Sequence, residues 1–390
     1  MAKRMYTSVD GKARLVKKMY TGVNGIARKV KKAYVGVGGV ARLFYKNGAE
    51  LVYNGQCTNL TASIPASLSS THNSNYVMFA GGYYSPTITT SAFHSNADAY
   101  DKNLTKIQAP NLSQPRRELG GASVNEYMLF GGGFGGTSSS GGSNLRTLDC
   151  YSPDLTRTTL ANLANTVRGI GLSTPHYAVF SDSLFNEPLI DVITPNLTAT
   201  TASRSVSLGN SGMATVGDYF LVAGGETSTS NVFTNICDVF NKNLVRSSGP
   251  TLRTSKERIV GISMPSYAVF CGGYYYAKGD SSPSKYPTDI DAYDNNLVRH
   301  ALTDLPSKQP TTGASVTNGE DTALVVFTGR EWMYYDTNLT LSNYSSLSSV
   351  TSSEHLLQTA EPIGNNILVA GSYSSSSSGT NNNVFRFTLT

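Results

Sequence analysis

Charged side chains and tryptophan are both scarce in this sequence. Only 15% of the 390 residues are charged, and tryptophan occurs once. Helical bundles need Ala, Glu, Lys and Leu in quantity, so this composition argues against them. Ser, Thr, Asn, Gly and Tyr take the place of charge, which is typical of short strands joined by turns. We therefore expect an all-β protein.

Cysteine motifs and long apolar runs are also missing. The four cysteines are widely spaced and show no CxxC or other metal-ligand spacing. Cys150, Cys237 and Cys271 lie in apolar strand patterns, so we expect buried free thiols. No apolar run approaches the roughly 18 residues of a membrane-spanning helix, and the opening MAKRMYTS has no signal-peptide core. The sequence predicts no metal, no cofactor, no signal peptide and no membrane insertion.

Positive charge is concentrated at the start of the chain. Residues 1–49 contain 12 Lys and Arg but a single acid, Asp10, which gives a net charge of +11. The remaining residues contain 19 basic and 25 acidic side chains, a net charge of −6. This asymmetry predicts two parts with different roles, residues 1–49 and residues 50–390.

The basic part consists of three copies of one 14-residue sequence: KRMYTSVDGKARLV (3–16), KKMYTGVNGIARKV (17–30) and KKAYVGVGGVARLF (31–44). Each copy has a central pair that favours a two-residue hairpin turn, namely Asp-Gly, Asn-Gly or Gly-Gly. A fourth such pair, Asn47-Gly48, follows. We expect a β-hairpin repeat module, either with long strands or with shorter strands and a second bend at the Lys-Lys pairs.

The basic residues of the repeats have three interpretations. Lysines on strand edges can simply prevent unwanted pairing. A basic module can also dock on an acidic partner or on a copy of itself, because isolated hairpins bury little and are marginal in water. Nucleic acid is the least favoured partner, since one Tyr per repeat serves packing equally well. The predicted docking residues are Lys17, Lys18, Arg28, Lys31, Lys32 and Arg42.

A longer repeat occupies the rest of the chain. Strand-like segments that end in a small pair, such as YVMFAGG (76–82), alternate seven times with segments such as ADAYDKNLT (97–105). The Leu of the second segment recurs every 42 to 53 residues, and weaker strand patterns flank both segments. Four short strands per unit at this period are the signature of a β-propeller blade. The last unit ends at Thr390 without a fourth strand, so we expect residues near 58–68 to supply it and close the ring.

The glycine pairs and the strands after them resemble the kelch-type propeller, over about residues 58–390. The likeness rests on an Asp-x-Tyr/Phe strand such as Asp98-Ala99-Tyr100 and on the sequences FAGG (79–82), FGGG (130–133), VAGG (222–225) and FCGG (270–273). The resemblance implies a seven-bladed kelch-like β-propeller that follows the N-terminal β-hairpin repeat module.

The opening repeats, Lys-Lys-x-Tyr-x-Gly-Val-x-Gly-x-Ala-Arg, are similar to those at the start of tail-fibre and other virion structural proteins of bacteriophages and prophages of Gram-positive hosts. This resemblance implies a non-enzymatic virion protein, made in the bacterial cytoplasm and located in the virion. Its repeats would attach it to other virion proteins of the tail, baseplate or capsid. Its propeller would bind a host-surface glycan or protein, and a homo-oligomer is compatible with this role.

Catalytic groups do not converge in the sequence. The five histidines share no position in the repeat, and Arg117, Arg168 and Arg258 all lie near first strands, where the repeat explains them. The Asp of each third strand recurs regularly, so we expect it to brace its blade by bonding a turn amide. The Asn-Leu-Thr triplets recur at one blade position and are interpreted as turns rather than glycosylation sites.

Tyr-rich polar segments follow the glycine pairs. Aromatic faces among small polar residues are suited to binding glycans or protein epitopes. The predicted ligand-binding residues are Tyr83, Tyr84, Phe134, Tyr274, Tyr275 and Tyr276. Two alternatives to the virion protein stay open: a carbohydrate-active propeller enzyme that acts on host surface polymer, and a cellular kelch-like scaffold.

Overall fold

The computed structural model divides the chain into two compact units, residues 1–50 with Thr390, and residues 51–389. The boundary is one residue from the one predicted. The structure describes residues 6–9, 12–15, 19–23, 26–30, 32–37, 40–46, 49–62, 67–84, 92–138, 141–181, 188–228, 232–275, 286–305, 310–329, 331–347, 357–371 and 382–390. Within these ranges every regular element is a strand, as an all-β composition predicts.

The first unit consists of hairpins, one for each 14-residue repeat. They are β1 (Tyr6–Val9) with β2 (Lys12–Leu15), β3 (Tyr20–Val23) with β4 (Ile26–Lys29), and β5 (Lys32–Val37) with β6 (Val40–Lys46). The innermost pairs, such as Val9 with Lys12, leave two-residue connections, as predicted. Each hairpin is a separate two-stranded sheet, so the version with shorter strands is correct.

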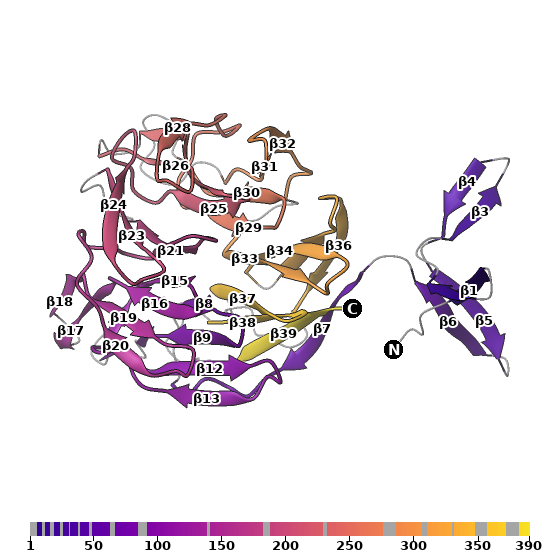
Figure 1. Cartoon of the computed structure of the whole chain (residues 1–390), viewed down its shortest axis with the longest axis horizontal. Helices are drawn as coiled ribbons and strands as arrows, with labels where there is room; N and C mark the ends of the chain where they lie inside the picture. Colours follow the sequence, from indigo (N-terminus) through magenta and orange to yellow (C-terminus); the bar gives the residue numbers. More distant parts are fainter. Residues whose placement is uncertain are drawn as a thin grey trace. The chain divides into compact units, whose positions relative to one another are not determined.

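The second unit contains seven four-stranded antiparallel sheets in its described residues (Figure 1). Sheet 1 contains β8 (Ser69–His72), β9 (Tyr76–Ala80), β12 (Ala97–Asp101) and β13 (Lys106–Ala109). Sheet 2 contains β15 (Gly120–Val124), β16 (Tyr127–Gly131), β19 (Leu148–Tyr151) and β20 (Arg157–Thr159). Sheet 3 contains β21 (Ile170–Ser173), β22 (Ala178–Ser181), β23 (Leu189–Ile193) and β24 (Ala199–Ser203). Sheet 4 contains β25 (Gly212–Val216), β26 (Tyr219–Glu226), β27 (Phe233–Phe240) and β28 (Arg246–Ser248).

The remaining sheets follow the same order. Sheet 5 contains β29 (Val260–Ser263), β30 (Tyr267–Cys271), β31 (Ile290–Asp294) and β32 (Arg299–Ala301). Sheet 6 contains β33 (Thr312–Thr317), β34 (Thr322–Thr328), β35 (Glu331–Tyr335) and β36 (Leu341–Ser346). Sheet 7 contains β37 (Thr359–Ile363), β38 (Asn366–Ala370), β39 (Val384–Leu389) and β7 (Leu51–Gln56). Two small sheets pair β10 (Tyr83–Tyr84) with β11 (Ala92–Phe93), and β17 (Phe134–Ser138) with both β14 (Arg116–Arg117) and β18 (Gly141–Asn144).

The sheets form a closed ring. Their first strands contact one another in the cycle β8, β15, β21, β25, β29, β33, β37 and back to β8. Apolar clusters fill the space between neighbouring sheets; one of them joins Phe79 of sheet 1 to Leu368 of sheet 7. The core therefore lies between the sheets, which explains why their second strands are buried on both faces.

The strand that closes the ring is β7 and not residues 58–68, which corrects the predicted closure. Thr61 instead donates its backbone N–H to the Asp98 carboxylate at 2.7 Å, from a segment that follows a fourth strand. Ser113 makes the same bond to Asp149 from the segment after β13. The Asn-Leu-Thr sequence at 59–61 therefore resembles the turns that elsewhere precede a fourth strand. Here, however, it comes after the fourth strand, β7. Among the described residues β6 pairs with β5 and β7 with β39, and the Asn47-Gly48 pair lies outside those residues.

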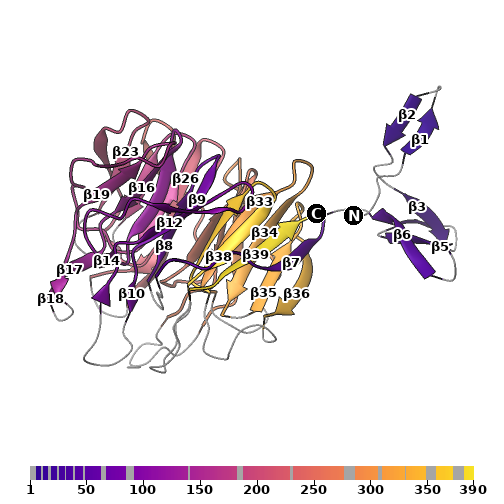
Figure 2. The same cartoon turned by 90° about the horizontal axis from the view of Figure 1, so that it is seen from below.

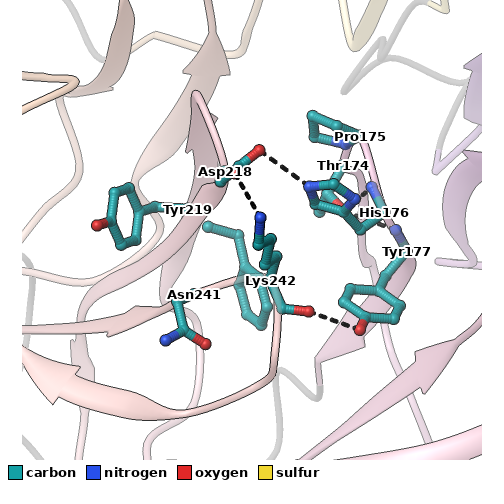
Figure 3. Close-up of a pocket in the computed structure, with 9 residues that line it drawn as sticks. Thr174, Pro175, His176, Tyr177, Asp218, Tyr219, Asn241 and Lys242 are labelled. Carbon is teal, nitrogen blue, oxygen red and sulfur yellow. Dashed lines mark hydrogen bonds and ion pairs between the residues drawn. The ribbon is translucent and has the colours of Figure 1, made fainter.

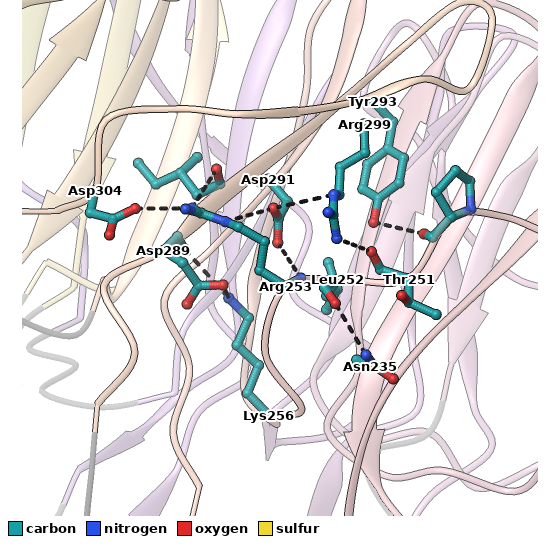
Figure 4. Close-up of polar contacts among 12 residues, drawn as sticks. Asn235, Thr251, Leu252, Arg253, Lys256, Asp289, Asp291, Tyr293, Arg299 and Asp304 are labelled. Atoms are coloured by element: carbon teal, nitrogen blue, oxygen red, sulfur yellow. Dashed lines mark hydrogen bonds and ion pairs between the residues drawn. The ribbon is translucent and has the colours of Figure 1, made fainter.

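The Asp of the third strand braces neighbouring sheets in sheets 1 to 5, as predicted. Five such carboxylates accept a backbone N–H from the segment after the previous sheet's fourth strand: Asp98 from Thr61, Asp149 from Ser113, Asp191 from Ala164, Asp238 from Ser205 and Asp291 from Arg253. Figure 4 shows this arrangement at Asp291, which also accepts from Arg253 Nε at 3.0 Å, while Lys256 Nζ lies 2.8 Å from Asp289. All five carboxylates therefore accept hydrogen bonds that hold neighbouring sheets together.

The turn prediction for the Asn-Leu-Thr triplets is also confirmed. The turn leucines have positive φ, for example 64° at Leu104, and Leu104 donates its N–H to the Asp101 carbonyl. The paired glycines that end the second strands have positive φ as well, 64° and 105° at Gly272 and Gly273. Cys150, Cys237 and Cys271 are buried free thiols, as predicted.

Candidate functional site

One edge of the ring carries Tyr83, Phe134 and Tyr274, three of the predicted ligand-binding residues. Each second strand ends where the first strand beside it begins, as the pairing of Gly120 with Gly131 shows. We call this the loop edge and the opposite one the turn edge. The ideal Cβ position of Gly120 is 2.8 Å from the Ile170 carbonyl oxygen, so the starts of neighbouring first strands lie side by side. In Figure 2, β10, β14, β17 and β18 all lie along this lower edge.

An arginine stacks against three aromatic rings at the loop edge. The Arg117 guanidinium carbon is 4.7 Å from the ring centroid of Tyr83, 6.0 Å from that of Phe93 and 5.4 Å from that of Phe134. The Tyr83 and Phe93 rings are 5.4 Å apart, and the Phe93 and Phe134 rings 5.9 Å. A guanidinium within about 6 Å of a ring face is attracted by the ring's quadrupole. The geometry thus fixes Arg117 on an aromatic platform.

A carboxylate joins this arginine to a second one. Glu118 lies 3.4 Å from Arg117 Nε and accepts a 2.6 Å hydrogen bond from Arg168 Nε. The Arg168 guanidinium is in turn 5.2 Å from the Phe134 ring. About a quarter of each of these three charged side chains is exposed, 28%, 27% and 25% for Arg117, Glu118 and Arg168. Arg117 and Arg168 carry two positive charges and Glu118 one negative charge, so the three side chains together have a net charge of +1.

The backbone beneath these side chains is held in an uncommon conformation. Ser67 and Glu118, just before first strands, have φ of 58° and 55°. Glu118 donates its N–H to the Ser67 carbonyl, and Gly169 donates to that of Glu118 at 2.7 Å. Positive φ at a residue other than glycine costs on the order of 1–3 kcal/mol and clusters at ligand sites. We call Tyr83, Phe93, Phe134, Arg117, Glu118 and Arg168 the arginine–aromatic cluster.

His94 lies directly beside the arginine–aromatic cluster. Its N–H donates to the Gly82 carbonyl, and its carbonyl accepts from Arg116. Its Nε2 is buried and has no hydrogen-bond partner among the described residues. Desolvation lowers the pKa of His94, against the opposing effect of a hydrogen bond with Asn96, so the neutral imidazole is favoured. A neutral imidazole can accept a proton.

The structure separates the other predicted ligand-binding residues. Tyr274 also lies at the loop edge, beneath Arg258, but only 7% of it is exposed. Tyr275 is half-buried. Tyr276 and the side chain of Tyr84 lie outside the described residues. The described aromatic residues of this edge are thus partly covered, rather than freely exposed as expected.

Sequence reasoning missed the arginines. Arg117, Arg168 and Arg258 were assigned to the repeat, yet all three stack on aromatic rings at the loop edge. A useful signal was present, because each of these arginines lies two or three residues before the start of a first strand. The rings that they contact come from other parts of the chain, so the pairing itself is invisible in the sequence.

The turn edge has a separate small depression between sheets 3 and 4 (Figure 3). His176 Nε2 lies 3.0 Å from Asp218, whose other oxygen is 3.5 Å from Lys242 Nζ. Tyr177 donates its hydroxyl to the Lys242 carbonyl at 2.7 Å. The hydrogen bond from His176, with the Lys242 and His176 charges, holds the pKa of Asp218 below its usual value. More than half of the Asp218 and Lys242 side chains is exposed, so this group is a solvated ion-pair network.

The predicted docking residues yield little structural detail. Arg28, Lys32 and Arg42 lie in β4, β5 and β6, where only the backbone is described, and Lys17, Lys18 and Lys31 lie outside the described residues. Among the described residues, no group of three His, Cys, Asp or Glu could hold a metal ion. The described residues likewise contain no helix long and apolar enough to span a membrane.

Comparisons with known proteins identify the fold. No protein-family model matches the chain, and a search of curated proteins finds no match either. Among solved structures, a virginiamycin B lyase from Staphylococcus aureus has a TM-score of 0.56 at 12% identity, covering 87% of this chain and 100% of that one. A streptogramin B lyase has a TM-score of 0.53 at 10% identity over 87% and 98%. YjhT has a TM-score of 0.51 at 12% identity over 74% and 96%.

The larger unit is a β-propeller. Its many four-stranded antiparallel sheets and its likeness to these structures agree on that. At 10–12% identity the likeness extends to the fold alone.

The same comparison corrects the functional prediction. Two of these propellers are described as lyases, and none of the three is described as a virion protein. The prediction of a non-enzymatic virion structural protein is therefore wrong, and so is the prediction that the chain is not an enzyme. The alternative, a carbohydrate-active propeller enzyme, agrees better with these neighbours.

Proposed function

We propose that this chain is a carbohydrate-active propeller enzyme that cleaves an anionic polysaccharide bound at the arginine–aromatic cluster. The observation that carries the proposal is the Arg117 guanidinium held over the rings of Tyr83, Phe93 and Phe134. Aromatic faces pack against the apolar faces of sugar rings. A guanidinium presents a rigid fork of N–H groups that matches a carboxylate or a sulfate. A polysaccharide that carries acidic groups satisfies both.

The ion pair of Glu118 indicates how an acidic sugar would bind. The Glu118 carboxylate already lies between the guanidinium groups of Arg117 and Arg168. A sugar carboxylate would displace it or join it, using the positive charge that the two arginines leave uncompensated.

We further propose that the ring is a seven-bladed, kelch-like propeller. Supporting this are seven four-stranded sheets in the described residues and paired glycines with positive φ at or after the ends of the second strands of sheets 1, 2, 4 and 5. In this assignment the arginine–aromatic cluster belongs to blades 1 to 3.

The basic hairpins fit the same substrate. Residues 1–49 carry a net charge of +11, which attracts an anionic polymer over a distance of about 10 Å at moderate salt. We propose that they hold the enzyme on the polymer while the propeller cleaves it. Removal of residues 1–49 then raises the KM for polymer at low salt and leaves kcat unchanged.

The test is an activity screen of the purified chain against anionic and neutral polysaccharides. New reducing ends report cleavage, and an unsaturated sugar that absorbs ultraviolet light distinguishes elimination from hydrolysis. We expect cleavage of an anionic substrate and loss of activity in Arg117→Gln. The matched control is Lys242→Gln, which removes one positive charge from the turn edge. Absence of cleavage across the screen, or equal activity of Arg117→Gln and Lys242→Gln, refutes the proposal.

A further inference from the structure

A second arginine stacks on aromatic rings at the same edge of the ring. The Arg258 guanidinium carbon lies 5.0 Å from the Tyr274 ring centroid, and the Tyr274 and Tyr286 rings are 6.5 Å apart in an edge-to-face arrangement. Tyr274 is buried, whereas Arg258 is exposed and Tyr286 is 50% exposed. The group therefore presents a cation and an aromatic ring to solvent on either side of a covered ring.

The backbone under this group is fixed by neighbouring segments. Glu257 and Tyr274 exchange N–H to carbonyl bonds at 3.0 Å in both directions. Arg258 donates its N–H to the Asn210 carbonyl at 2.7 Å, and Asn210 Nδ2 donates to Glu257 Oε2 at 2.7 Å. Arg258 and Asn210 both have positive φ, 52° and 54°. Sheet 4 thus holds Arg258 in place, as sheet 1 holds Glu118 in the arginine–aromatic cluster.

Arg258 differs from Arg117 and Arg168 in its ion pairing. In the part of the chain that the structure describes, no carboxylate forms an ion pair with it, unlike Arg117 and Arg168, which share Glu118. Two arginines nearby in the sequence form ion pairs: Arg246 with Asp238 at 3.1 Å, and Arg253 with Asp291 at 3.0 Å.

The two groups lie on one edge of the ring, at different sheets. Tyr83, Phe134 and Tyr274 all follow the glycine pair of a second strand, and Glu118 and Arg258 each lie two residues before the start of a first strand. Because neighbouring first strands run side by side around the ring, these positions all emerge at the loop edge. One extended polymer lying across that edge would meet both groups.

We propose that Arg258, Tyr274 and Tyr286 form a second subsite for the same anionic polysaccharide, so that one polymer chain is held at two points across the loop edge. This inference rests on the proposed function. Binding at the second point becomes intramolecular once the first is occupied, so the affinity for long chains exceeds that for short ones without any new contact. Chains too short to span the edge gain nothing.

The experiment is a binding titration of the full chain with a length series of the anionic oligosaccharide that the activity screen identifies. Four proteins are compared: the wild type, Arg117→Gln, Arg258→Gln and the control Lys242→Gln. We expect wild-type affinity to rise steeply above a threshold length. Arg258→Gln should abolish that rise, a loss on the order of 100-fold for the longest chains. Chains shorter than the threshold bind only at the arginine–aromatic cluster. For these chains the affinity of Arg258→Gln should stay within about twofold of the wild-type affinity.

Tyr286→Ala provides a second variant that removes the exposed ring without touching the Arg258 backbone, and it should flatten the length dependence in the same direction. If Arg258→Gln and Tyr286→Ala match Lys242→Gln at every length while Arg117→Gln weakens binding, the second subsite is refuted and the proposed function stands. If Arg117→Gln binds as the wild type does, the proposed function itself is refuted.

Discussion

His72 Nδ1 lies 2.7 Å from Glu361 Oε2 and so joins the first strand of sheet 1 to that of sheet 7, across 289 residues of sequence. Ser70 donates its hydroxyl to the other oxygen of the same carboxylate at 3.0 Å. The pair lies where the ring closes, beside the contact between β37 and β8. Closure therefore depends on a titratable contact as well as on the pairing of β7 with β39.

The ring-closing pair predicts that stability falls as pH rises. Desolvation lowers the pKa of His72, but its hydrogen bond to Glu361 and the charges of Glu361 and Glu126 outweigh this effect and raise the pKa overall. A raised folded-state pKa gives stability that is complete below the unfolded value of about 6.5 and is lost as pH rises through the folded value. Urea unfolding of the wild type and His72→Gln should therefore show a wild-type advantage at about pH 5.5 that shrinks by about pH 8.

His94 is the matched control for this measurement, with the opposite sign. Burial lowers its folded-state pKa, so the wild type should lose stability relative to His94→Gln as pH falls below the unfolded value of about 6.5. Parallel pH profiles for the two variants would contradict the assignment of both histidines.

The buried pair of Arg116 and Asp149 predicts a large difference between two arginines on one carboxylate. Arg116 Nη2 lies 2.8 Å from Asp149 with neither side chain exposed, whereas Arg157, 2.9 Å from the other oxygen, is 28% exposed. Removal of one partner from a buried pair costs about 3–5 kcal/mol, and removal of a partly exposed one about 1 kcal/mol or less. Arg116→Ala should thus lower the free energy of unfolding several times more than Arg157→Ala. Equal losses in denaturant unfolding would show that the pair is not buried as described.

Gly272 and Gly55 both have positive φ, so alanine substitutions at these two positions distinguish steric crowding from backbone strain. Gly272 has φ of 64°, and a Cβ there would lie 2.0 Å from Pro310 Cδ, whereas Gly55, with φ of 86°, has no atom within 4 Å of the same position. Alanine at Gly55 should cost the strain alone, about 1 kcal/mol. Alanine at Gly272 should cost about 1–3 kcal/mol more because the chain must shift. Thermal unfolding of both variants measures the difference, and equal losses would contradict the close approach of sheets 5 and 6.

The assignment of β7 to sheet 7 predicts where the chain can be shortened. A chain that begins at residue 50 keeps β7 and should fold with cooperative thermal unfolding. A chain that begins at residue 57 loses the buried Leu51 and the contacts of Tyr53 with Phe385 and Phe387, 6.3 and 5.5 Å between ring centroids. It also exposes β39 as an edge strand, so we expect aggregation or a much lower Tm. A folded chain from residue 57 would instead favour closure by residues 58–68.

The sequence predicted the repeating parts of this molecule because each repeat is subject to the same local physics. The glycine pairs, the Leu turns and the carboxylate at Asp98 and its equivalents recur because most of the sheets use the same turn and the same brace. The closing strand was misplaced because the Asn-Leu-Thr sequence that ends at Thr61 looks like the turns found before fourth strands elsewhere in the chain. Periodicity cannot tell these two positions apart.

The candidate site was only partly predictable for a different reason. Tyr83, Phe134 and Tyr274 were recognised as aromatic residues after glycine pairs, which is a local pattern. Their arginine partners lie elsewhere in the chain, with Arg117 after Tyr83 but Arg258 before Tyr274. The stacking of Arg117 on Tyr83 depends on how the small sheets of β10 and β17 meet β14. Contacts of that kind arise from tertiary packing, which a single sequence does not display.

The most direct test of the central claim is a crystal structure of the full chain with an anionic oligosaccharide bound. The account predicts a sugar carboxylate or sulfate within hydrogen-bond distance of the guanidinium groups of Arg117 and Arg168, with a sugar face against Tyr83 or Phe134. An oligosaccharide bound only at the turn edge, with Glu118 still paired to both arginines, would contradict it.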